Sequence, residues 1–175
     1  MTARGGLPLV GEPIELCFLP ELRVRRGKLV SGSARGAEVH AGSYIRQRRI
    51  VLDSALRADQ REMRRILLHE IFHFVWPRIG NRRRRAFELL IASELAQRIQ
   101  GELGWSAEWR KNALTGARRR LRGKHWREYL CESFCDTGAW IWHGARHAEF
   151  TLAPAARRER ARWWRRHFGG QPLPV

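Results

Sequence analysis

The stretch Leu67-Leu68-His69-Glu70-Ile71-Phe72-His73-Phe74-Val75 contains the pattern His-Glu-x-x-His inside a segment that the sequence predicts to be one helix. On a helix, His69 and His73 lie four residues apart on one face, so both imidazoles can bind the same metal ion. Glu70 is turned by about 100° from His69, which leaves its carboxylate near that ion but free to act on a water molecule. The pattern therefore predicts a hydrolytic zinc site.

The residues around the motif favour a buried helix. Asp59-x-x-Glu62 is typical of a capping box, residues 61–76 contain no helix breaker, and Pro77 and Gly80 follow as stop signals. The alternative is a pair of satisfied core histidines, but the motif would arise by chance only about 0.02 times in a chain of this composition. Two imidazoles and a carboxylate on an apolar helix are costly to bury unless they are paired or bind a metal.

The length and composition predict one domain. The chain has 175 residues, 43% of them apolar, and eight tryptophans, which is enough for a substantial core. We expect residues 1–175 to form a single domain with loose ends at 1–13 and 169–175. No apolar run approaches the ~20 residues of a membrane span and no signal peptide is recognisable, so the sequence predicts a soluble, cytoplasmic protein that does not enter membranes.

The cysteines do not predict a disulfide framework. Cys17, Cys131 and Cys135 are an odd number, which suits a reducing compartment.

The order of periodic segments predicts an α+β fold. Four short strand-like segments come first, at 14–19, 22–30, 39–46 and 49–53. Helical periodicity follows the motif, at 86–99, 106–114, 124–143 and 155–168. We therefore expect a small, mostly antiparallel sheet before the active helix and a helical portion around and after it.

The chain is strongly basic, with 34 Lys and Arg against 17 Asp and Glu and a net charge of +17. Arginine runs at 82–85, 118–122 and 157–166 could neutralise phosphates or attract an acidic partner. Solvated helix faces would explain the same charge, and no nucleic-acid-reading motif accompanies it. Both interpretations stay open.

A catalytic zinc needs three protein ligands and one open position. The best candidate for the third is Glu132, a charged residue in the otherwise apolar helix predicted over 124–143. Asp136 lies one turn later on the same face, where it could accept the outer N–H of a ligating histidine.

Other third ligands stay open. They are carboxylates and imidazoles elsewhere in the helical portion: Glu94, Glu128, His125, His143 and His147. Cys131 and Cys135 could also bind zinc. We prefer apolar packing for both, because two thiolates beside two imidazoles would make a closed structural site with no use for Glu70.

The combination of His69-Glu70-x-x-His73 with a later Glu132-x-x-x-Asp136 resembles the gluzincin metallopeptidases. Residues 132–136 are also similar to the Glu-x-x-Cys/Ala-Asp/Asn segment of ImmA/IrrE-like proteases, and the small basic chain resembles SprT-like proteins. The resemblance covers the two site helices and the order of sheet before helix. It implies a zincin-like fold, Glu132 as third ligand and Asp136 against a ligating histidine.

These residues predict a zinc-dependent peptidase acting on a peptide or protein substrate. Zn²⁺ held by His69, His73 and Glu132 would lower the pKa of a water molecule to about 7, with Glu70 as general base.

Three residues are candidates for stabilising the transition state: Tyr129, His143 and His147. The resemblance implies that an extended peptide adds to the edge of the strand at 39–45.

Two functions of other classes remain. One is a nucleic-acid-associated protein that uses the arginine runs and whose metal site is structural or acts on DNA-bound partners. The other is an inactive structural metal protein, for which Glu70 would be dispensable.

Overall fold

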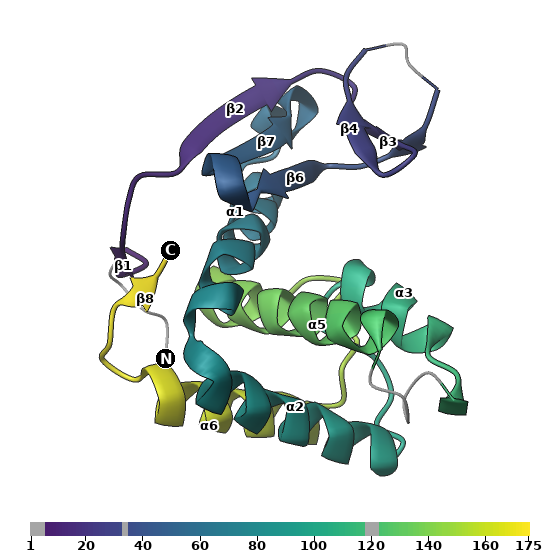
Figure 1. The fold of residues 1–175 in the computed structure, drawn as a ribbon, viewed down its shortest axis with the longest axis vertical. Coiled ribbons are helices and arrows are strands. Elements are labelled where there is room, and N and C mark those ends of the chain that lie inside the picture. Colours follow the sequence, from purple (N-terminus) through teal and green to yellow (C-terminus); the bar gives the residue numbers. More distant parts are fainter. Residues whose placement is uncertain (1–5, 33–34, 118–122) are drawn as a thin grey trace.

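A computed structural model describes residues 6–32, 35–117 and 123–175 (Figure 1). Strands come first and helices follow, so the predicted α+β fold is confirmed. The arginine run at 118–122 lies outside the described residues. Within the described ranges, no helix is both long and apolar enough to cross a membrane.

The sheet next to the motif has three strands in the order β2-β7-β6: β2 (Glu15–Leu19), β7 (Arg49–Asp53) and β6 (Ala41–Tyr44). The central strand β7 is the most buried of the three, since its Ile50, Val51 and Leu52 lie in the core. Strand β6 pairs with β7 in antiparallel fashion, as predicted, but β2 pairs with β7 in parallel. Strand β6 is left at the edge of the sheet.

A second small sheet follows β2 and has the order β4-β3-β5: β4 (Lys28–Val30), β3 (Arg23–Arg25) and β5 (Ala37–Glu38). The predicted single strand at 22–30 is therefore wrong, because the chain turns back at Arg26 and Gly27. Both residues have positive φ, 50° and 73°, and a two-residue turn with two positive φ angles joins antiparallel strands tightly.

The motif lies on α1 (Gln60–Val75). The Asp59 carboxylate caps this helix by accepting from the backbone N–H groups of Arg61 and Glu62, at 3.0 and 2.9 Å. Only half of the predicted capping box forms, because the Glu62 carboxylate accepts from Arg65 instead.

The chain leaves α1 through a 3₁₀ turn, Trp76–Arg78, which contains Pro77. Helix α2 (Gly80–Ala96) begins earlier than predicted, so the arginine run at 82–85 is helical. The later helices whose bounds lie within the described residues are α3 (Trp105–Ala113), α5 (Lys124–His143) and α6 (Pro154–Phe168). The bounds of α5 are those predicted, and α3 lies one residue earlier than the predicted segment 106–114.

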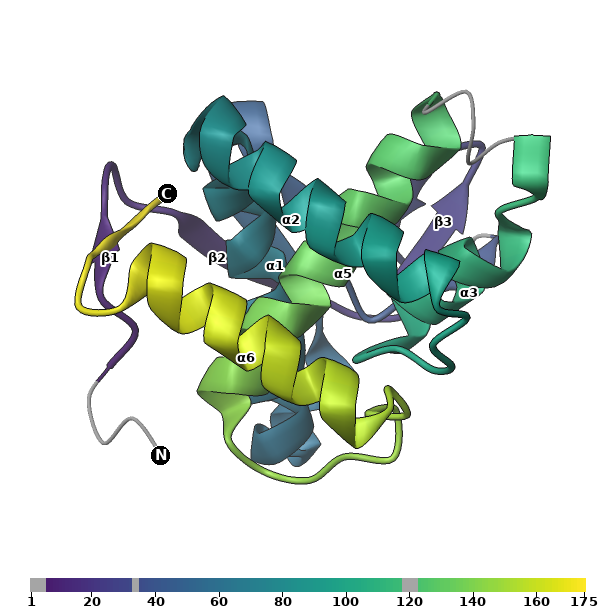
Figure 2. The same cartoon turned by 90° about the horizontal axis from the view of Figure 1, so that it is seen from below.

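Helices α2 and α6 cover one side of α5, which crosses α1 (Figure 2). The crossing is close because Gly138 of α5 has no side chain: a Cβ there would lie 2.6 Å from the ring of Phe72 on α1. Aromatic rings fill the space around it. Phe134 stacks on Trp164 of α6 with centroids 5.4 Å apart and meets Phe87 of α2 edge to face at 5.5 Å.

Parts of the two segments that we expected to be loose, 1–13 and 169–175, pair with each other, while residues 1–5 lie outside the described residues. Strand β1 (Leu9–Val10) pairs in parallel with β8 (Leu173–Pro174). Leu173 and Val175 are buried in the main core, and this apolar burial orders the tail.

A buried ion network ties the helices together behind the motif. Arg160 of α6 is fully buried and binds the carboxylates of Glu94, at 2.6 Å, and Glu102, at 2.8 Å. The Tyr129 O–H donates to Glu102 at 2.5 Å. The arginine run at 157–166 is therefore not wholly a solvated surface.

Removing Arg160 should destabilise the fold. Arg160→Met keeps an apolar stem but leaves Glu94 and Glu102 buried without their guanidinium partner, so we expect the free energy of unfolding to fall by about 3–5 kcal/mol. Urea denaturation measures this. The matched control is Arg158→Met, at an exposed position on the same helix, which should change stability by less than about 0.5 kcal/mol. Equal stability of the two variants would contradict the proposed weight of the network.

Candidate metal centre

The two motif histidines and Glu132 bring three donor atoms together. His69 Nε2 and His73 Nε2 on α1 are 3.2 Å apart. Glu132 Oε2 on α5 lies 3.3 Å from His69 Nε2 and 3.9 Å from His73 Nε2. A tetrahedral zinc with bonds of 2.0–2.1 Å separates its ligand atoms by about 3.4 Å. The three donor atoms therefore fit one zinc ion with small adjustments.

Asp136 fixes the ring of His69. Its Oδ1 lies 2.7 Å from His69 Nδ1, and its Oδ2 accepts from the backbone N–H of Ala107 at 3.3 Å. A carboxylate at Nδ1 favours the tautomer that leaves the Nε2 lone pair free for a metal. Gly104 packs against the carboxylate so closely that a Cβ would lie 2.4 Å from it.

Glu70 lies beside this trio, with its carboxylate held from the sheet. The Ser43 O–H of β6 donates to Glu70 Oε2 at 2.6 Å. Glu70 is 8% exposed, and its carboxylate lies within 4.8 Å of both histidine rings. Oε2 is thereby oriented by Ser43, which leaves Oε1 to accept a proton.

A basic side chain outside the metal-binding trio also contacts Glu132. Arg110 of α3 binds its Oε1 at 3.2 Å, which leaves Oε2 for the histidines. Burial alone would raise the pKa of Glu132, but His69, His73 and Arg110 lower it to about 2. This carboxylate is therefore ionised across the whole physiological range.

The neighbouring acidic groups raise the pKa of the two motif histidines. Burial alone would lower the pKa of both rings, but Asp136 raises that of His69 well above its usual value. Cys131, Glu132 and Glu70 raise the pKa of His73 to about 9. The raised pKa values mean that a proton competes with a metal for each ring.

Two hollows open onto the trio and share His69, Glu70, Ala41 and Ser106 as lining residues. The smaller, of about 240 Å³, also touches His73, Glu132 and the β6 residues Gly42 and Ser43. The larger, of about 410 Å³, extends past Trp105, which is 65% exposed.

Several sequence candidates lie elsewhere. Tyr129 is fully buried with its hydroxyl on Glu102, which corrects the expectation that it stabilises a transition state. The carboxylate of Glu94 forms an ion pair with Arg160, so the structure does not bring it to the trio.

The downstream imidazoles are also apart from the trio. His143 packs edge to face on the ring of Phe150, His147 lies 3.2 Å from Glu62, and neither lines the two hollows. The roles expected for them in ligation or catalysis are therefore corrected as well. At the start of α5, Glu128 is partly exposed and lies near Lys124 and His125, away from the hollows.

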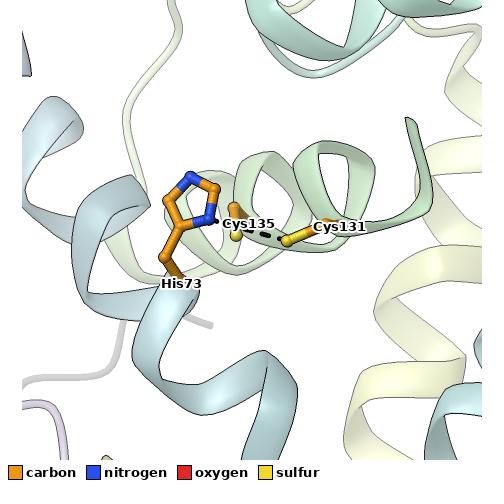
Figure 3. A group of neighbouring side chains, drawn as sticks. All are labelled: His73, Cys131 and Cys135. Carbon is orange, nitrogen blue, oxygen red and sulfur yellow. Dashed lines mark hydrogen bonds between the residues drawn. The ribbon is translucent and has the colours of Figure 1, made fainter. Parts of the chain in front are cut away.

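The cysteines of α5 lie one turn apart beside His73 (Figure 3). Cys135 is fully buried in the core, as expected for apolar packing. Cys131 instead lies with its Sγ 3.6 Å from His73 Nδ1. A hydrogen bond from Cys135 and the contact with His73 lower the pKa of Cys131 to about 6, against an opposing effect of burial. Burial and the neighbouring Cys131 raise the pKa of Cys135.

Sequence reasoning missed Ser43, Arg110 and Gly104. A serine in a short strand and an arginine among 34 basic residues carry no distinguishing signal, because their partners lie far along the chain. Nothing in the sequence around Gly104 indicates its close contact with Asp136 either.

Comparison with protein-family models, with curated proteins and with solved structures gives no match for this chain. The resemblance to gluzincins therefore rests on the residues of α1 and α5.

Zinc affinity should rise with pH. Protonated imidazoles cannot bind a metal, the pKa of His73 is about 9 in the metal-free chain, and that of His69 is raised as well, so we expect the apparent affinity to increase throughout the range from pH 6 to about 9. Glu132, ionised throughout, contributes no slope. Competition with a chelating indicator measures this, and His125→Ala, at an exposed ring, should give the same profile as wild type. A flat affinity over this range would contradict the assignment of the histidines as ligands.

Proposed function

We propose that this protein is a zinc-dependent peptidase. One observation carries the proposal: His69 Nε2, His73 Nε2 and Glu132 Oε2 converge at 3.2–3.9 Å, the spacing of zinc ligands, with a fourth group, Glu70, beside them. Three protein ligands with a hollow on the open side are typical of catalytic zinc rather than of closed structural sites.

The residues of the chain divide the chemistry. Bound zinc supplies Lewis acidity, which lowers the pKa of water to about 7 and polarises a carbonyl. Glu70 takes a proton from the attacking water and passes it to the leaving amine. Ser43 orients the Glu70 carboxylate toward the smaller hollow. Asp136 holds the His69 ring with its Nε2 toward the metal position.

The substrate is a peptide in an extended conformation. Strand β6 is the sheet edge nearest to the trio, and its Ala41, Gly42 and Ser43 line the smaller hollow. An extended segment pairing with this edge gains main-chain hydrogen bonds that do not depend on its sequence. A carbonyl of that segment would then face Glu70.

Zinc content of variants tests the ligand set. Wild-type protein is expected to hold about one zinc per chain, and Glu132→Ala to lose it, because two imidazoles alone hold zinc weakly. The matched control is Glu128→Ala, one turn earlier on α5, which should keep the metal. Elemental analysis after dialysis gives the answer. Full occupancy in Glu132→Ala, or its loss in Glu128→Ala, would overturn the assignment.

Glu70→Gln separates catalysis from metal binding. The amide keeps the size of the side chain and the zinc, but it cannot accept the proton, so hydrolysis of a peptide library should fall by about 10²- to 10⁴-fold. Loss of zinc in this variant would make Glu70 a ligand. Undiminished hydrolysis would sink the peptidase proposal and favour a structural metal.

A second function is favoured by one feature of the surface. Helices α2 and α6 bring arginines from two sequence runs together: Arg83 lies over the ring of Phe168. Burial lowers the pKa of His167, and the nearby positive charges of Arg83, Arg166 and Arg82 lower it further. We propose that this cluster, the α2–α6 basic patch (Arg82, Arg83 and Arg166), binds the phosphate backbone of a nucleic acid.

Binding through this patch should depend on salt. Duplex DNA affinity should fall by about tenfold or more between 50 and 200 mM salt, since each phosphate contact releases counterions. Arg82→Ala with Arg166→Ala should weaken binding and reduce the salt slope, whereas Arg25→Ala, on the distant strand β3, should not. Fluorescence anisotropy measures both. Equally weak binding at either salt concentration would assign the charge to solvated surface.

A further inference from the structure

The imidazole of His73 faces a different donor set on each side. Its Nε2 points to His69 and Glu132. Its Nδ1 points to Cys131, with Cys135 next to it on the same face of α5 (Figure 3). The peptidase proposal uses the first set and has no role for the second.

We propose that His73 Nδ1, Cys131 Sγ and Cys135 Sγ form a separate site for a thiophilic cation such as Cu⁺ or Cd²⁺. The three donor atoms lie within 4.8 Å of one another. The site shares the imidazole of His73 with the zinc trio, through the opposite ring nitrogen, but it needs neither Glu70 nor Glu132.

The geometry suits metal–sulfur bonds. With the bond lengths of zinc as a guide, 2.3 Å to sulfur and 2.0–2.1 Å to nitrogen, N and S lie about 3.6 Å apart on a tetrahedral ion and about 3.8 Å apart on a three-coordinate one, and Nδ1 and the Cys131 Sγ are 3.6 Å apart. Two sulfurs on the tetrahedral ion lie about 3.8 Å apart. Residues four apart on a helix share a face, so small rotations about χ1 bring both sulfurs to this separation.

The donor set selects the class of metal. Two thiolates and one imidazole, with no oxygen donor, favour soft ions over Mg²⁺ or Ca²⁺. Cys135 is fully buried, whereas Cys131 and His73 are partly exposed, so an ion arrives from the His73 side and ends in a closed site. The closure disfavours a water ligand and suits ions of low coordination number.

The bond changes balance without another reactant. One metal–nitrogen and two metal–sulfur bonds form, and the two thiols release their protons to solvent. A proton on Nδ1 leaves as well. Nothing is oxidised or reduced.

Cadmium reports on this site without any assay of hydrolysis. Cd²⁺ bound to thiolate absorbs in the ultraviolet through charge transfer, and Cd²⁺ bound to nitrogen and oxygen does not. Reduced, metal-free protein titrated with Cd²⁺ should develop this band to saturation. The double variant Cys131→Ser, Cys135→Ser should abolish it. Each single variant should weaken affinity by more than the roughly 10- to 100-fold typical of an outer partner.

Matched variants isolate the site. Cys17→Ser removes the third cysteine, on β2, and should keep the band, as should Glu132→Gln. A band that survives in the double cysteine variant, or disappears in Cys17→Ser, would overturn the proposal. Far-UV circular dichroism checks folding, and if Cys135→Ser unfolds, the partly exposed Cys131→Ser decides alone.

The outcome is separable from that of the peptidase proposal. A cadmium band, together with zinc occupancy that is unchanged in Glu132→Ala, would support this site and overturn the zinc ligands of the peptidase proposal. Zinc occupancy that depends on Glu132, with no cadmium band, would do the reverse.

Discussion

The close crossing of α1 and α5 is the constraint on which the candidate site depends. Gly138 lets the two helices approach until the ring of Phe72 occupies the space of a missing side chain. At that separation Asp136 reaches His69 and Glu132 reaches both histidines. A wider crossing would separate the two buried imidazoles from these carboxylates, and a buried polar group without its partner is costly. The apolar packing around Gly138 and the polar contacts of the site therefore require the same separation between α1 and α5.

The rest of the chain holds that crossing from outside. Arg160 joins α6 to Glu94 on α2 and to Glu102 before α3, and Tyr129 of α5 reaches the same Glu102. A buried pair of this kind adds little net stability over an apolar core, but it tolerates few alternative arrangements. We infer that it sets the order of the helices around α5 rather than strengthening the fold as a whole.

The sequence predicted what is local and missed what is formed by distant partners. Strand β7 at Arg49–Asp53, helix α5 at Lys124–His143 and the Asp59 cap follow from periodicity and side-chain chemistry over a few residues. The α+β order and the positions of the motif residues were accessible in the same way.

The misses have tertiary causes. Arg160 belongs to a run that resembles a solvated basic face, and only carboxylates 58 and 66 residues away make it a core residue. Ser43 and Arg110 are ordinary surface types whose meaning comes from Glu70 and Glu132. The pairing of β1 with β8 and the hairpin turn at Arg26 likewise depend on contacts or backbone angles that apolar periodicity does not encode.

Strand β6 lies at one edge of its sheet, next to the candidate metal centre. Its residues Ala41, Gly42 and Ser43 line the hollow that His69, Ser106 and Glu132 also line. An open sheet edge is a template for pairing with another strand, so any strand that pairs with β6 would lie beside the candidate metal centre.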